Sequence, residues 1–245
     1  MSNVAKENLN FQLPTTDEKP EYVQKLFQKV ARYYDLMNDC MTFGLHRLWK
    51  KKACQLLCLP IQGKVLDVAC GTGDLAFYLN KQYPNAELVG LDFCEDMLVI
   101  ARKRAQDKQL NAQFIQGDGL NLPFENNQFN GAVISYGLRN MADYKRCLSE
   151  MVRVIEPGSR VVILDMSHPN KLMGVLSAFY RFQVMPLLGK FIANDTESYK
   201  YLSNSIYFYL NQVELVGLMQ DSGLTNVQYE NLMGGVCALH WGLKA

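Results

Sequence analysis

The sequence predicts an α/β protein whose sheet is mostly parallel and carries helices on both faces. Three observations support this class. Short apolar runs alternate with amphipathic helical patterns over residues 64–166, as in a series of β–α units. The runs are apolar at successive positions, which is typical of strands covered on both sides. The first run, KVLDVACGTGDL, ends in two glycines where a helix is expected to begin.

The N-terminal region is predicted to hold two helices after a polar lead-in. Residues 1–20 are polar, and we expect a flexible segment that is not a secretory signal. From Glu21 onward, apolar residues recur at helical spacing, at Val23, Leu26, Phe27, Val30 and Tyr34. A second helix is predicted over Leu45–Leu57. Its apolar residues are expected to face inward, at Leu45, Leu48, Trp49, Ala53 and Leu56, and its basic residues outward, at Arg47, Lys50, Lys51 and Lys52. We expect residues 21–58 to form a lid or cap on a single domain that covers residues 21–245.

The central region supplies five strands and three helices. The predicted strands are Lys64–Ala69, Glu87–Phe93, Ala112–Asp118, Phe129–Tyr136 and Arg160–Met166. The helices between them are predicted at Leu75–Gln82, Glu95–Asp107 and Asp143–Val154. A helix at Gln212–Gln220 follows later, and two strands joined at Gly234-Gly235 complete a sheet of seven: Val227–Leu232 and Val236–Leu243.

A helical insert is predicted after the fifth strand, at residues 170–205. Its apolar stretch, Leu172–Ala193, is interrupted by Arg181, Gln183, Pro186 and Lys190, so its uncharged runs fall short of the ~20 residues of a membrane-spanning helix. The insert could line a groove for a lipid tail and rest on a membrane, or it could be a core or dimer-interface helix. The sequence does not separate these alternatives.

Composition excludes several classes of function. The net charge of +1 gives no broad field that would attract nucleic acid. Seven cysteines form no C-x-x-C pair, and Cys54 and Cys58 lack the further ligands of a zinc site, so we expect no metal. Buried free thiols in a reducing cytoplasm are the simpler interpretation, and we expect a cytoplasmic protein.

The glycine turn stands among carboxylates. The segment from Gly71 to Ala76 fits the G-x-G-x-x-[G/A] pattern between a strand and a helix. Asp67, Asp92 and Asp118 lie at or near the ends of the first three strands, where ligands bind in open parallel sheets. An acid at the end of the second strand can accept hydrogen bonds from both hydroxyls of a ribose. A turn without a ligand is the alternative.

The acidic residues favour one kind of nucleotide over another. Asp74 begins the helix after the glycine turn, where the pyrophosphate of a nicotinamide or flavin cofactor would lie. A carboxylate there disfavours phosphates. S-adenosylmethionine is a cation without phosphates, built from a sulfonium, an ammonium, a ribose and an adenine, and it suits such a cleft.

Four stretches resemble a known family. D-x-x-C-G-T-G-D followed by G-L-D resembles the class I methyltransferases, whose fold is Rossmann-like. Three further stretches resemble the quinone C-methyltransferases of ubiquinone and menaquinone biosynthesis: RYYDLMNDCMTFGLHRLW, YGLRN with MVRVIEPG, and NDTESYKYLSNS with GVCALHWG. The resemblance extends from about Val23 to the C-terminus. It implies S-adenosylmethionine-dependent methylation of a polyprenyl-methoxy-benzoquinol, of a demethylmenaquinol, or of both.

The resemblance also implies which residues hold the cofactor. Asp92 would bind the ribose, Asp118 and Gly119 would frame the adenine, and Ser135 would lie beside the methionine end. The remaining expected cofactor-binding residues are Asp67, near the end of the first strand, and Gly71, Thr72 and Gly73 in the glycine turn. The sequence shows two local departures. One is Cys70, at a position where relatives vary between glycine, alanine and cysteine, and the other is residues 209–212, where many relatives have a His-Pro-x-Gln turn.

Methylation of a quinol carbon requires a quinol hydroxyl to lose its proton. Arg139 and Asn140 follow the fourth strand and are candidates to stabilise the phenolate or to order a water, although Arg139 could instead pair with an acid. Asp165 ends the fifth strand and is a rival base or a cap of the next turn. His168 is a third candidate base.

Other polar and aromatic residues have packing roles as their main alternative. We expect His46 to be a surface or packing residue and His240 to be a buried, hydrogen-bonded residue. Tyr33, Tyr34 and Asp35 could form a lid over the cofactor or pack on the domain. A homodimer or a biosynthetic complex, and a peripheral membrane contact, stay open. So do other functions: methylation of another lipid or small molecule, a nicotinamide-dependent oxidoreductase, or a non-catalytic partner.

Overall fold

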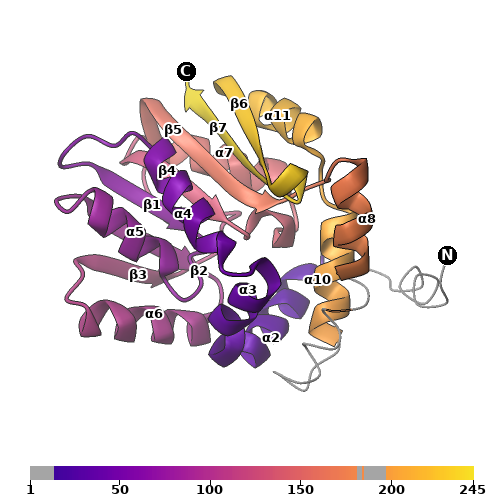
Figure 1. Ribbon diagram of the computed structural model, residues 1–245. Coiled ribbons are helices and arrows are strands. Elements are labelled where there is room, and N and C mark those ends of the chain that lie inside the picture. The colour runs from indigo at the N-terminus through magenta and orange to yellow at the C-terminus, as the bar shows by residue number, and fades with distance from the viewer. Residues whose placement is uncertain (1–13, 181–183, 185–196) are drawn as a thin grey trace.

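The seven strands form one mixed sheet in the order β3-β2-β1-β4-β5-β7-β6. The computed structural model describes residues 14–180, 184 and 197–245 (Figure 1). The strands are β1 (Lys64–Val68), β2 (Glu87–Asp92), β3 (Ala112–Gln116), β4 (Phe129–Ser135), β5 (Ile155–Met166), β6 (Leu224–Leu232) and β7 (Cys237–Lys244). The first five run parallel, and β7 runs antiparallel to both β5 and β6. The predicted sheet is therefore confirmed.

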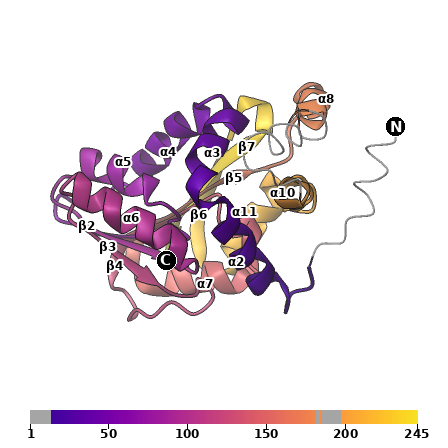
Figure 2. The ribbon, with the colours of Figure 1, turned by 90° about the horizontal axis from the view of Figure 1, so that it is seen from below.

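Helices cover both faces of the sheet (Figure 2). One face carries α4 (Leu45–Leu56), α5 (Asp74–Gln82) and α6 (Glu95–Asp107), and the other carries α7 (Tyr144–Val154) and α11 (Gln212–Asp221). Successive residues of a strand enter different cores. Val65 packs in the cluster with α4 and α5, whereas Leu66 packs in the cluster with α7 and α11. This is why the strands are apolar at successive positions.

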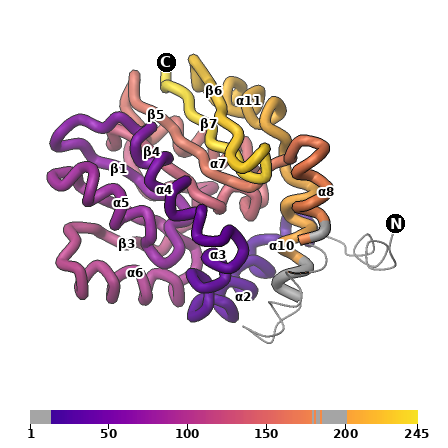
Figure 3. Tube along the Cα trace, viewed as in Figure 1, coloured from indigo at the N-terminus to yellow at the C-terminus, as the bar shows by residue number. Residues whose placement is uncertain are grey.

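The remaining helices gather at the carboxyl edge of the parallel strands. They are α2 (Lys19–Val30), α3 (Tyr34–Thr42), α8 (Lys171–Phe179) and α10 (Glu197–Tyr207), and the tube in Figure 3 shows all four on that side. The strand order reverses here, because β2 lies on one side of β1 and β4 on the other. A crevice at such a switch point is where open α/β sheets bind ligands.

The orientation predicted for α4 is wrong at two positions. Lys50 was expected outside but is only 4% exposed, whereas Leu48 was expected inside and is 64% exposed. The reason is an ion pair. Lys50 Nζ lies 3.0 Å from Asp74 Oδ2 at the start of α5, and this carboxylate replaces the solvent that a lysine normally seeks.

Several boundaries also differ from prediction. The first helix begins at Lys19 and not at Glu21, and β5 extends back to Ile155. A helix that was not predicted, α3, follows a 3₁₀ turn at Ala31–Tyr33. Most of the predicted insert's apolar stretch, with its break at Pro186, lies outside the described residues. Within the described ranges, no helix is long and apolar enough to cross a membrane.

The departure from the family at residues 209–212 has a local solution. Asn211 caps α11, since its side chain accepts hydrogen bonds from the main-chain N–H groups of Val213 and Glu214. The Glu214 carboxylate accepts in return from the Asn211 N–H, at 2.8 Å. This capping box begins the helix without a proline.

Candidate active site

A cleft of about 820 Å³, open to solvent, lies at the carboxyl ends of β1, β2 and β4. One wall of the cleft contains five of the predicted site residues: Gly71, Asp92, Asp118, Gly119 and Ser135. The opposite wall comes from the first turns of α2: Pro20, Val23, Gln24 and Phe27. The cleft therefore lies between the sheet edge and the N-terminal helix.

The glycine turn has a conformation that other residues adopt poorly. Gly71 and Gly73 have φ angles of +56° and +78°. A Cβ atom on Gly73 would lie 3.0 Å from Ala101 Cβ and from the ring of Phe114, so the turn is also tightly packed. The main chain can thus approach a ligand closely while α5 packs against α6.

Asp92 joins the glycine turn to the end of β2. Its Oδ2 atom accepts a hydrogen bond from the Gly71 N–H at 2.7 Å, and its Oδ1 atom accepts from the Cys94 N–H at 2.9 Å. Burial raises the pKa of Asp92, while these N–H donors favour the charged form. A carboxylate offers about four lone-pair positions, so both oxygens keep the capacity to accept from two vicinal hydroxyls in the cleft.

The part of the cleft around Asp118 and Gly119 combines an apolar slot with polar edges. Phe93, Met97, Leu120 and Met141 line this part of the wall. Asp118 Oδ1 accepts from the Leu120 N–H at 2.9 Å, which fixes its carboxylate. Next to it, a Cβ on Gly119 would lie 2.9 Å from Met141 Cε, so this position is closely packed as well. A flat, partly polar group fits such surroundings.

A smaller cavity adjoins the cleft beneath the glycine turn. The two share Tyr34, Ala69, Gly71 and Ser135 as wall residues. Asp67 and Thr72, both predicted site residues, line the smaller cavity and not the larger cleft. Asp67 Oδ1 and Ser135 Oγ are buried without a hydrogen-bond partner in the described structure. Buried polar atoms without partners indicate a place that a polar ligand completes.

Arg139 and Asp165 form a buried pair beside the cleft. Arg139 Nη1 lies 3.4 Å from Asp165 Oδ1, and the Arg139 N–H donates to Asp165 Oδ2 at 3.2 Å. Burial raises the pKa of Asp165, and the charge of Arg139 opposes that shift. The described wall of the cleft includes neither residue. The pairing that was the alternative for Arg139 is therefore present, and Asp165 anchors it.

Asn140 is the predicted catalytic residue that reaches the cleft. Its Nδ2 group donates to the carbonyl of Tyr136 at 3.2 Å, and its Oδ1 atom accepts from the hydroxyl of Tyr201 on α10 at 3.3 Å. These bonds fix the amide in one orientation. The turn Leu138–Asn140 is thus held by β4 on one side and by α10 on the other.

The histidines lie away from the cleft wall. His168 is hydrogen-bonded through Nε2 to the carbonyl of Tyr209 at 2.7 Å, and it does not line the cleft. His240 is buried, bonded to the carbonyl of Gln212, and burial lowers its pKa to about 4. His46 is buried against the hydroxyl of Thr42. Packing roles for His46 and His240 are confirmed.

The N-terminal residues proposed as a lid divide into two groups. Tyr34 lines both cavities and packs edge-on against Phe27. Asp35 accepts a hydrogen bond from the hydroxyl of Thr72 at 2.9 Å and forms an ion pair with Arg104 on α6. Tyr33 is 42% exposed and belongs to the surface.

The sequence analysis missed Lys19. Its ammonium donates to the carbonyls of Arg139 and Met141, at 3.1 and 2.7 Å, and lies 5.0 Å from the ring centroid of Tyr144. Burial and the charge of Arg139 lower the pKa of Lys19 to about 8. The two hydrogen bonds of Lys19 connect the start of α2 to the turn that carries Asn140. No local pattern connects residues so distant in the sequence.

Fold and site together define a class I methyltransferase, an enzyme that uses S-adenosylmethionine. An S-adenosylmethionine-dependent methyltransferase of Thermotoga maritima shares the fold with a TM-score of 0.67, at 19% identity, over 91% of this chain and 99% of that chain. The model of the ubiE/COQ5 methyltransferase family matches residues 15–244. The chain belongs to the ubiE/COQ5 methyltransferase family.

Individual relatives agree over nearly the whole chain. The chain is 42% identical over 231 residues to the ubiquinone/menaquinone biosynthesis C-methyltransferase UbiE of Pseudomonas syringae pv. tomato, covering 93% of this chain and 90% of that protein. It is 38% identical over 250 residues to the UbiE of Idiomarina loihiensis, with complete coverage of both chains.

The Lys19 contact predicts a particular pH dependence of stability. The pKa of Lys19, about 8 in the folded protein, lies below the ~10.4 of an exposed lysine, so between these values the unfolded chain binds the extra proton. The free energy of unfolding of the wild type should therefore rise relative to that of Lys19→Met as the pH increases from 8 to ~10.4. Urea titrations of both proteins across this range measure the difference.

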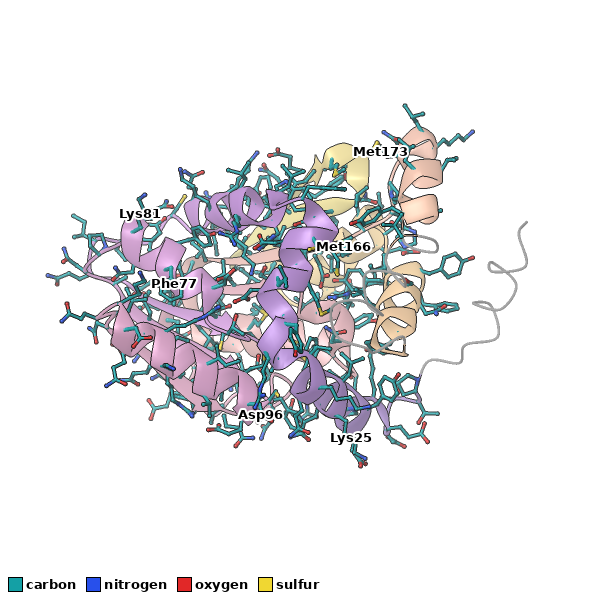
Figure 4. The ribbon with its side chains drawn as sticks, turned by 60° about the horizontal axis from the view of Figure 1, so that its bottom comes forward. Lys25, Phe77, Lys81, Asp96, Met166 and Met173 are labelled. Atoms are coloured by element: carbon teal, nitrogen blue, oxygen red, sulfur yellow. The ribbon has the colours of Figure 1, made fainter. Side chains whose placement is uncertain are left out.

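Lys25→Met is the matched control, because Lys25 lies on the same helix and points away from the protein (Figure 4). Two results would contradict the lowered pKa of Lys19. The first is that the free energy of unfolding of the wild type rises with pH relative to that of Lys25→Met as well. The second is that the difference between the wild type and Lys19→Met does not change with pH.

Proposed function

We propose that this protein transfers a methyl group from S-adenosylmethionine to a ring carbon of a polyprenyl benzoquinol, of a demethylmenaquinol, or of both. The proposal rests above all on Asp92, a half-buried carboxylate that lines the cleft and keeps free lone pairs toward it. The curated relatives are named for ubiquinone and menaquinone biosynthesis, which supports a quinol as the methyl acceptor.

The residues present fit the cofactor. Asp92 would accept from the ribose hydroxyls, and Asp118 would accept from the adenine amino group above the apolar slot. The unpartnered atoms of Asp67 and Ser135 would meet the methionine end, beside the glycine turn and Thr72. When bound, S-adenosylmethionine supplies an electrophilic methyl group on its sulfonium.

The chain's own residues then have to make the quinol nucleophilic. A phenol-like hydroxyl has a pKa of ~10, so a nearby positive charge that stabilises the phenolate promotes its ionisation. The Nε atom of the Arg139 guanidinium has no hydrogen-bond partner in the described structure, which leaves this N–H group available to a phenolate. Asn140 would contact the quinol, and Asp165 would hold Arg139 in position.

A nicotinamide-dependent oxidoreductase is a poorer match. Asp74 lies in the first turn of α5, where a pyrophosphate would have to bind, and it is already paired with Lys50. The local charge therefore disfavours a dinucleotide. Methylation of another lipid or small molecule would use the same cofactor residues and differ in the acceptor alone.

We also propose that α8 meets a lipid bilayer. Its outer face carries three strongly exposed apolar side chains: Leu172, Val175 and Leu176. A polyprenyl quinol stays in the bilayer because each buried CH₂ group contributes ~0.8 kcal/mol, so the enzyme has to reach its substrate at a membrane surface. An exposed apolar helix face suits that encounter.

Cofactor binding is the first test. Calorimetric titration of the wild type with S-adenosylmethionine and S-adenosylhomocysteine should give binding, and NADH should give none. Asp92→Asn should weaken both adenosyl ligands ~10- to 100-fold, because a charged hydrogen bond contributes ~1.5–3 kcal/mol. Asp96→Asn, on exposed α6 surface (Figure 4), should leave the affinity unchanged. Absence of adenosyl binding would refute the proposal, and a gain of one methyl in a quinol, by mass spectrometry, would complete it.

The role of Arg139 is tested by turnover. Arg139→Met should lower kcat by ~10²-fold or more, since it removes the charge that stabilises the phenolate. The affinity for S-adenosylhomocysteine should stay within about twofold, because Arg139 lies outside the cofactor cleft. Arg139→Lys, which keeps the charge, should recover part of kcat. An unchanged kcat in Arg139→Met would assign the residue a structural role.

Membrane contact is tested with lipid vesicles. The double variant Leu172→Glu, Val175→Glu should sediment less with phosphatidylcholine–phosphatidylglycerol vesicles, because charges on the outer face of α8 oppose burial in lipid. Its KM should rise for a long-tailed quinol and not for a short-tailed one. Val99→Glu introduces one glutamate at an exposed position of α6 and should change neither result. If Val99→Glu reduced vesicle binding as much as the double variant does, the result would argue against α8 as the membrane contact.

A further inference from the structure

A buried lysine faces the smaller cavity from α4. The Lys50 side chain is 6% exposed, and its Nζ atom lies 3.0 Å from Asp74 Oδ2 and 6.0 Å from the ring centroid of Tyr136. Burial opposes the charge of Lys50, but Asp74, Tyr34 and Asp67 raise its pKa, so the ammonium is retained. Lys50 thus brings a positive charge to the wall of the smaller cavity beneath the glycine turn.

Hydrogen-bond capacity is left over on several residues that line this cavity. An ammonium has three donors, and in the described structure Lys50 has a hydrogen bond to Asp74 alone. In the walls of the same cavity, Asp67 Oδ1 and Ser135 Oγ have no partner there. A cavity whose walls hold both spare donors and spare acceptors is completed by a group that carries both charges.

We infer that Lys50 binds the carboxylate of the cofactor's methionine moiety, beside an ammonium held by Asp67 and Ser135, and that Lys50 thereby selects ligands with an intact amino acid. The inference rests on the proposed function and adds a residue to it. An α-amino-carboxylate is a zwitterion, so its two charges match the ammonium of Lys50 and the unpartnered acceptor atoms of Asp67 and Ser135. Asp74 is the anion that balances Lys50 whether or not a ligand is bound.

The position of Asp74 makes this role for Lys50 compatible with a stable fold. Asp74 lies in the first turn of α5, where a helix favours a negative charge. It also lies 3.8 Å from Arg104, on α6. The Asp74 carboxylate is therefore held by several positive partners, and Lys50 can share its ammonium with a second carboxylate without leaving Asp74 unpaired.

The test pairs a ligand change with a matching protein change. Calorimetry measures the dissociation constants of S-adenosylhomocysteine and of its decarboxylated analogue, which keeps the amine, for the wild type, Lys50→Met and Lys51→Met. The wild type should bind the complete ligand ~10- to 100-fold more tightly, the contribution of one charged hydrogen bond. Lys50→Met should lose this preference while binding the decarboxylated analogue as the wild type does. Lys51→Met, on the exposed side of the same helix, should keep the preference.

Each other outcome has a defined meaning. Equal weakening of both ligands in Lys50→Met, or a preference that survives the substitution, would overturn the inference. Should Lys50→Met fail to fold by circular dichroism, the wild type decides alone, because equal affinity for the two ligands would overturn the role. A wild type that binds neither ligand would refute the proposed function itself, whereas adenosyl binding without carboxylate selection would leave that function standing.

Discussion

The geometry of the cleft depends on the hydrogen bonds that Asp92 accepts from the N–H groups of Gly71 and Cys94. They join the turn after β1 to the turn after β2, and so they fix the distance between two of the loops that form the cleft. An ionised carboxylate can do this and still face a ligand, because it has more lone pairs than the main chain uses. The same atoms thus organise the fold and offer the binding surface.

Around this centre, three contacts bind the helical cover to the sheet edge. Asp35 of α3 meets Thr72 and Arg104, Lys19 of α2 meets the turn after β4, and Tyr201 of α10 meets Asn140. Each contact ends on a residue at or beside the cleft. The positions of α2, α3 and α10 are therefore coupled to the geometry of the site. Displacing one of these helices would also release a residue at the site.

The sheet and its ligand edge were predictable because their signals are local. Buried parallel strands are apolar at successive positions, and Asp92 and Ser135 stand at strand ends where the residue order alone places them. The pairing of Lys50 with Asp74 was not predictable, because helical periodicity assigns a lysine to solvent and contains no information about a carboxylate on another helix. Likewise, Arg139 is a plausible cleft residue by position, and only the path of β5 shows that Asp165 binds it.

The place of β7 has a consequence for how this chain is made. β7 lies between β5 and β6, and its register pairs Leu243 with Arg160. During synthesis the long edge of β5 therefore stays unpaired until a much later segment leaves the ribosome. Its residues Val161–Leu164 are fully buried in the finished protein, so an apolar strand edge is open to other chains in that interval. Protection by a chaperone, or rapid completion of translation, is of most value to this protein at that stage.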